Sequence, residues 1–164
     1  MNKMHSTKNS LPPEIRTEVA VILNQMLADL TDLYSQTKQA HWNVRGNHFY
    51  TLHKLFDDLA AAVEPHIDDT AERITALGGI AKGTVRQAAE SSRLPEFPIE
   101  QSGDMLFLAA LIERYALCAN ETRKAIDETS ELGDADTADL LTAVSRDLDK
   151  SLWMLEAHEP RASQ

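Results

Sequence analysis

Apolar residues recur at steps of three and four along four long segments of this 164-residue chain. This spacing places them on one face of an α-helix, and no segment shows the alternation typical of a β-strand. The first helix is predicted to begin around Pro12 and Pro13, a favourable helix start, and to run towards His41–Asn43. Its apolar face comprises Ile15, Val19, Ile22, Met26, Leu30 and Leu33.

The second helix is predicted to begin near Phe49 or Tyr50 and to end at Gly78 and Gly79, since glycine commonly follows the last helical turn. Pro65 falls inside this segment and is expected to kink the helix or remove one hydrogen bond. Apolar spacing continues on both sides of Pro65, so the prediction remains one helix.

The stretch over residues 80–103 contains two prolines and is long for a loop in a compact domain, so a short helix is predicted at Thr84–Ser91. A third long helix is expected from Asp104 to just before Gly133. The fourth is expected to be capped by Asp134 or Asp136 and to end before Pro160. The predicted fold is therefore all-α, a ferritin-like four-helix bundle with a long crossover between its second and third helices.

Residues 1–10 lack periodicity and are expected to form a mobile N-terminal tail, with the bundle over 11–159 and a C-terminal tail over 160–164. The net charge of −10 favours cations over nucleic acid as partners. Cys118 is the only cysteine, which excludes a disulfide framework and favours a small buried apolar role. No signal peptide or membrane span is evident, so a cytoplasmic protein is expected.

One stripe of the second helix carries metal-binding residue types. His53 and Asp57 are four residues apart, and Asp68 and Glu72 repeat that spacing, with Glu64 one turn before Asp68. Histidine with several carboxylates is a ligand set for iron or manganese rather than for structural zinc. The simpler alternative is a solvated acidic helix face, and the spacing alone does not separate the two.

Asp57 and Asp68 are separated by about 16 Å along a helix, too far to share one ion. A two-fold axis that sets two copies of this helix antiparallel would bring the first pair of one chain to the second pair of the other. His41, at the end of the first helix, is placed to add a ligand to the first pair. The sequence thus suggests two equivalent metal sites between two subunits.

Several blocks of sequence resemble the Dps family of mini-ferritins, and the resemblance covers nearly the whole chain after the tail. The most specific block is Lys38-Gln39-Ala40-His41-Trp42-Asn43-Val44-Arg45-Gly46. It is followed by Phe49, Leu52-His53, Asp57, Asp68, Ala71-Glu72-Arg73, Leu77-Gly78-Gly79, Arg114-Tyr115-Ala116, Arg123-Lys124-Ala125-Ile126, Asp136-Thr137-Ala138-Asp139 and Ser145-Arg146-Asp147-Leu148-Asp149-Lys150.

The resemblance implies a hollow homododecamer with an iron-oxidising site at its two-fold interface. By position, His41, His53 and Asp57 match the metal ligands of one subunit, Asp68 and Glu72 match those of its partner, and Trp42 matches the tryptophan beside them. Such proteins typically oxidise ferrous iron with hydrogen peroxide and store the ferric product. Zinc or manganese at the same ligands remains open, as does interception of radicals by Trp42 and Tyr50.

Acidic residues near the start of the fourth helix are where family members line a three-fold pore. Asp139 and Asp147 are the candidate pore residues here, while capping explains one of Asp134 and Asp136. The remaining histidines are assigned no metal, and His48 and His66 are expected to be loop and surface groups. Tyr115 and Trp153 are expected to be packing residues.

Some family members compact DNA through lysine-rich tails, and this tail offers Lys3 and Lys8 against an acidic body. Two function classes therefore stay open: an iron-oxidising storage enzyme, and a nucleoid-architectural protein in which iron oxidation is secondary. A non-catalytic ferritin-like shell is a weaker alternative, since all five ligand positions hold the expected residue types.

Overall fold

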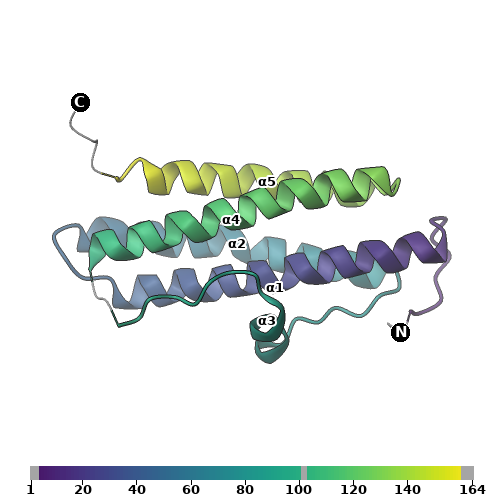
Figure 1. Cartoon of the computed structure of the whole chain (residues 1–164), viewed down its shortest axis with the longest axis horizontal. Helices are drawn as coiled ribbons and strands as arrows, with labels where there is room; N and C mark the ends of the chain where they lie inside the picture. Colours follow the sequence, from purple (N-terminus) through teal and green to yellow (C-terminus); the bar gives the residue numbers. More distant parts are fainter. Residues whose placement is uncertain (1–3, 101–102, 160–164) are drawn as a thin grey trace.

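The computed structural model describes residues 4–100 and 103–159. It contains four long helices, α1 (Pro13–Asn43), α2 (Phe49–Ala76), α4 (Asp104–Glu131) and α5 (Ala135–Glu156), and the short helix α3 (Val85–Ser91). The long helices lie side by side as a bundle, with α3 on the outside beside α1 (Figure 1). No strand occurs in the part of the chain that the structure describes. The predicted fold class and the order of its helices are confirmed.

Both ends of the bundle bring together segments that are distant in sequence. The α1–α2 turn, the start of α4 and the end of α5 lie at one end, on the left in Figure 1. The start of α1, the end of α2 and the α4–α5 turn lie at the other end. The long connection that contains α3 returns the chain from the second end to the first, so α4 runs in the same direction as α2.

The core is aliphatic with few aromatic side chains, and its largest fully buried members come from all four long helices: Leu23, Met26, Leu27, Phe56, Phe107, Leu111, Tyr115 and Leu148. The hydroxyl of Tyr115 lies 3.2 Å from that of Thr37, which satisfies both groups without water. Burial raises the pKa of Cys118 to about 12, so its thiol is not reactive at neutral pH. The packing roles predicted for Tyr115 and Cys118 are confirmed.

Side-chain caps are present at the starts of α3 and α5 and absent from those of α1, α2 and α4. Asp134, rather than Asp136, caps α5 by accepting a hydrogen bond from the Thr137 backbone N–H at 3.1 Å. Thr84 caps α3 in a capping box with Gln87. α2 continues through Pro65, whose ring is exposed.

Two predictions about single residues are wrong. His66 is buried, because it lies on the same face of α2 as buried Val63 and Thr70, and its Nε2 is 2.8 Å from Asp147 Oδ2 of α5. Trp153 is 63% exposed in the single chain, because at 100° per residue it falls opposite the apolar face of α5 that carries Leu148 and Leu155.

Residues 4–10 have no regular secondary structure, yet the tail contacts the bundle. The backbone N–H of His5 donates a 2.7 Å hydrogen bond to the carbonyl of Gly78. Gly78 has a φ of +88°, and a Cβ there would lie 2.6 Å from the His5 carbonyl oxygen, so the close approach requires glycine. Lys3 lies outside the described residues, and the mobility of the tail stays a prediction.

None of the helices in residues 4–100 and 103–159 is both long and apolar enough to span a membrane.

Candidate metal site

His41 and His53 hold each other in a reciprocal arrangement where α1 and α2 meet. His41 Nδ1 lies 2.7 Å from the backbone carbonyl oxygen of His53, and His53 Nδ1 lies 2.9 Å from that of His41. The two rings stack with their centroids 4.0 Å apart. Because a carbonyl oxygen only accepts, each Nδ1 must carry its hydrogen, which leaves each Nε2 with a lone pair for a metal. A bond from the second ring nitrogen to a carbonyl is typical of metal-binding histidines.

Asp57 completes this group, which we call the histidine half (His41, His53 and Asp57). Its Oδ1 lies 3.8 Å from His41 Nε2 and accepts a 2.7 Å hydrogen bond from Lys38 Nζ. The Lys38 ammonium, more than any other contact, lowers the pKa of the Asp57 carboxyl, so the group is ionised at neutral pH. Its other oxygen, Oδ2, makes no hydrogen bond within the described residues.

Asp68 and Glu72, the carboxylate half, lie on the same stripe of α2 but form no such arrangement. Both residues are exposed, and neither carboxylate forms a hydrogen bond or an ion pair with any described residue. The helical rise puts Asp68 about 16 Å from Asp57. Across residues 4–100 and 103–159, no three histidine, cysteine or acidic side chains converge as a metal site would require. Within one subunit the two groups of candidate ligands therefore lie apart, and their union across two subunits stays a prediction.

Three aromatic side chains contact the histidine half or lie near it in sequence. Phe49, the first residue of α2, stacks on His53 with ring centroids 5.2 Å apart. Trp42 directly follows His41 and is 66% exposed, and Tyr50 is 73% exposed. Trp42 and Tyr50 are therefore not packed in the core of one subunit, so the Trp42 indole and the Tyr50 phenol can contact a partner or a solute.

The chain resembles known proteins along almost its full length. Residues 21–160 match the family model described as the ferritin-like domain. A curated relative from Agrobacterium fabrum, named "DNA protection during starvation protein", is 47% identical over 156 residues, which cover 95% of this chain and 96% of the relative. The chain belongs to the Dps family.

Solved Dps structures agree with this assignment. "DpsC from Streptomyces coelicolor" is 32% identical and superposes with a TM-score of 0.93, covering 99% of this chain and 95% of that one. "Mycobacterium smegmatis Dps tetragonal form" is 31% identical with a TM-score of 0.91, covering 99% of this chain and 98% of that one. The fold and the family of this Dps chain are thus shown by sequence and by structure.

The acidic residues predicted for a Dps pore have different environments. Asp139 is exposed on α5, while Asp147 pairs with His66 and keeps 56% of its side chain exposed. Eight residues of helix separate the two, about 12 Å along the axis, so in a pore they would lie at different depths. Asp134 is buried against Arg73 of α2, at 2.6 Å, and serves the bundle rather than a pore. The pore assignment of Asp139 and Asp147 stays a prediction.

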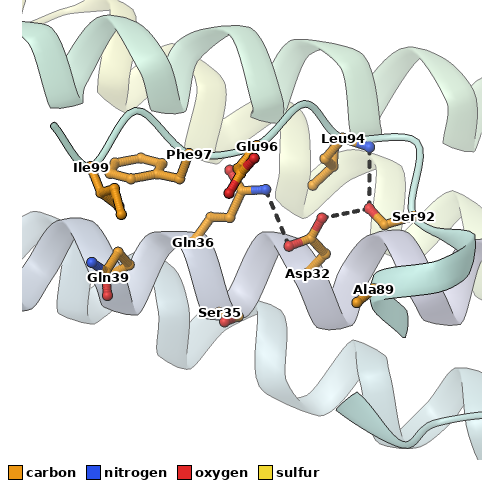
Figure 2. Close-up of a pocket in the computed structure, with 10 residues that line it drawn as sticks. All are labelled: Asp32, Ser35, Gln36, Gln39, Ala89, Ser92, Leu94, Glu96, Phe97 and Ile99. Carbon is orange, nitrogen blue, oxygen red and sulfur yellow. Dashed lines mark hydrogen bonds between the residues drawn. The ribbon is translucent and has the colours of Figure 1, made fainter. Parts of the chain in front are cut away.

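A groove of about 490 Å³ lies between α1 and the segment that follows α3 (Figure 2), and no candidate metal ligand lines it. Its two carboxylates come from Asp32 and Glu96, and no histidine lines it. Asp32 is already bonded to the Ser92 hydroxyl at 2.6 Å and to the Gln36 amide at 3.1 Å. The bond from Ser92 joins the connection to α1, whereas that from Gln36 lies within α1, so the groove is a structural seam in which Asp32 is already bonded.

Lys38 is the site residue to which sequence reasoning gave no role. It stands in the most specific block of the Dps resemblance and lies one helical turn before His41 on α1. That spacing places a cation beside the metal ligands, but only the structure shows that it contacts Asp57.

Proposed function

We propose that this Dps chain oxidises ferrous iron at sites shared by two subunits and stores the ferric product inside a homododecamer in the cytoplasm. The observation that carries the proposal is the reciprocal bonding of His41 and His53. It leaves both Nε2 atoms available as ligands, while Asp68 and Glu72 of the same subunit lie too far along α2 to share an ion with them. A two-fold axis would supply Asp68 and Glu72 from a partner, giving two equivalent sites for each dimer.

Ferrous iron is the substrate of such a site. Two imidazole nitrogens and three carboxylates form a mixed ligand set, and hard carboxylate oxygens stabilise ferric over ferrous iron. Few protein ligands leave positions open for an oxidant. We propose hydrogen peroxide as the preferred oxidant: one peroxide takes two electrons from two ferrous ions and, with two protons, becomes two waters. Both reagents of hydroxyl-radical chemistry are then removed in one reaction.

Trp42 has a defined place in this scheme. It follows a ligand in sequence and is exposed, so its indole is suited to donate an electron to a radical that escapes the site. Asp139 and Asp147 are proposed to lead ferrous ions through a three-fold pore to the interior. Zinc and manganese can compete for the same nitrogen and oxygen ligands.

Mixed assembly tests the shared site directly. One variant carries His53→Ala and Asp57→Ala, and the other carries Asp68→Ala and Glu72→Ala, so neither forms a complete site with itself. Unfolding the two together and reassembling them at equal amounts should restore about a quarter of the wild-type sites, because half of random dimers are mixed and each holds one intact site.

The measurement is the initial rate of peroxide-dependent iron oxidation at low iron. The two variants assembled separately and then combined are the control and should remain inactive. Full activity in either single variant would contradict the ligand assignment. No recovery in the reassembled mixture would contradict the intersubunit arrangement.

DNA binding is a second candidate function, and two observations favour it. The Agrobacterium fabrum relative carries DNA protection in its name, and Lys8 is exposed in the tail. Several tails on one shell would act together through effective concentration, although the acidic body opposes binding.

A gel shift of supercoiled DNA by the iron-free assembly tests this function. The shift should appear at low salt, weaken near physiological salt, and disappear in a variant lacking residues 1–9. Absence of a shift even at low salt would leave a mini-ferritin whose protection is purely chemical.

A further inference from the structure

The α1–α2 turn, which joins the two metal-site histidines, is held from outside by α4. The backbone N–H of His48 donates a 2.9 Å hydrogen bond to Asp104 Oδ2, and His48 Nδ1 lies 3.0 Å from the same oxygen. The other carboxylate oxygen, Oδ1, accepts a 2.9 Å hydrogen bond from the Met105 N–H. Asp104 therefore bonds the turn before α2 and the first turn of α4 at once.

Two helix N-termini converge on this one carboxylate. His48 occupies the N-cap position of α2 without any capping bond from its own side chain, and Gly103 occupies that of α4 and has no side chain to offer. Uncapped N–H groups leave the first turn of a helix free to fray. The positive ends of both helix dipoles favour a negative charge here. These bonds, that from the His48 N–H first, lower the pKa of the Asp104 carboxyl.

The turn is built around the Asp104 side chain. Gly46 has a φ of +142°, and a Cβ at this position would lie 2.5 and 2.7 Å from the two carboxylate oxygens. Any other residue there would both strain the backbone and displace the carboxylate. Only 15% of the Asp104 side chain is exposed, so the contact is enclosed by the turn.

A continuous set of contacts leads from Asp104 to the metal-binding histidines. Phe49 follows His48, donates its N–H to the Gly46 carbonyl at 3.2 Å and stacks on His53. His53 in turn bonds to and stacks on His41. A shift of the turn would therefore move Phe49 and change the separation and angle of the two imidazoles.

We propose that Asp104 and His48 form a latch that positions the histidine half, with Asp104 as a positioning residue for metal binding. The inference rests on the proposed function, since it assigns the latch to that same site. Residues that orient ligands without touching the metal typically change metal affinity by 10- to 100-fold when removed.

Cobalt(II) is the probe, because its visible absorption reports the number and kind of its ligands. In the assembled protein, Asp104→Ala should raise the cobalt Kd about tenfold and alter the spectrum. It should raise the iron concentration needed for half-maximal oxidation by a similar factor while leaving the rate at saturating iron close to wild type. Asp104→Asn should restore most of the affinity, because its amide oxygen still accepts from the His48 N–H.

Asp149→Ala is the matched control. It also removes a carboxylate that pairs with a basic side chain of another element, here Arg123 of α4, but it lies on α5 away from the turn. It should leave the cobalt Kd within about twofold of wild type, as expected for an exposed ion pair. Cobalt binding by Asp104→Ala that equals wild type, or equal losses in Asp104→Ala and Asp149→Ala, would overturn the latch.

His48→Ala keeps the inference testable if Asp104→Ala fails to fold. It removes only the imidazole and should weaken cobalt binding about threefold, as expected for one lost hydrogen bond. An unchanged Kd in a folded His48→Ala assembly would then overturn the latch. A wild-type protein that neither binds cobalt at these ligands nor oxidises iron would overturn the proposed function as well, so the two failures are distinguishable.

Discussion

The two halves of the α2 stripe differ in how much of their geometry one subunit fixes. In the histidine half, the Nδ1 atoms are bonded to carbonyls, the rings are stacked, and Asp57 is bonded to Lys38. In the carboxylate half, Asp68 and Glu72 are exposed and form no hydrogen bond through their carboxylates in the described parts of the chain. The side chains of the histidine half are ordered without a metal, whereas the geometry of the carboxylate half depends on the group that lies opposite it.

This difference follows from position along the helix. The histidine half lies where α1, α2 and their connecting turn converge, so neighbouring backbone supplies carbonyl acceptors. The carboxylate half lies about three to four turns from Asp57, on a face of α2 that meets only solvent in one subunit. If the two halves meet in a dimer as proposed, the site is assembled only with its oligomer, which would prevent a lone subunit from oxidising iron without a cavity to hold the product.

The largest expected effect compares removal of each half. His53→Ala with Asp57→Ala, and Asp68→Ala with Glu72→Ala, should each slow peroxide-dependent iron oxidation by on the order of 100-fold or more, because both halves hold the same ions. Their stabilities should differ. Only the first variant loses internal hydrogen bonds, so it alone should unfold at a lower urea concentration in the metal-free protein. Identical unfolding curves would show that the histidine half is not ordered beforehand.

A smaller effect is expected for the cation that occupies one oxygen of Asp57. Lys38→Met removes the ion pair and keeps the apolar stem, so cobalt should bind up to about fivefold more tightly, within the range for partly exposed ion pairs. Lys54→Met is the control: Lys54 is exposed and forms no ion pair with Asp57, although its charge lowers the pKa of that carboxyl. Weaker binding in Lys38→Met would instead assign Lys38 to orienting the carboxylate.

The smallest effect concerns the latch of Asp104 and His48, which acts on only the histidine half. The pKa of Asp104 is lower in the folded protein than its unfolded value of about 3.9, so the charged carboxylate stabilises the fold above that pH. The contribution is lost as the pH falls through the folded pKa. The difference in unfolding free energy between wild type and Asp104→Asn should become smaller as the pH falls from about 5 to about 3. Urea unfolding at several pH values measures it, and a constant difference down to pH 3 would contradict the shift.

Capping chemistry and apolar spacing were enough to predict the helices from sequence. The end of α1 at Asn43 and the starts of α2 at Phe49 and α4 at Asp104 lie within one residue of the positions predicted from sequence. The prediction is accurate because prolines, glycines and acidic caps act over one helical turn. His66 was misjudged because a histidine is usually exposed, and its partner Asp147 lies 81 residues away on another helix. Trp153 was misjudged because an aromatic residue usually packs, whereas its position on α5 faces away from the core.

The sequence by itself determined the four-helix bundle and the stripe of ligand types on α2, and it predicts a site shared by two subunits, since all three follow from helical periodicity and rise. Only the tertiary structure decided the imidazole tautomers, the contact between Lys38 and Asp57, and the bond from Asp104 to the α1–α2 turn. These features join residues 12, 19 and 56 positions apart. Local spacing fixes which side of a helix a residue occupies, but the packing of one helix against another fixes which atoms meet.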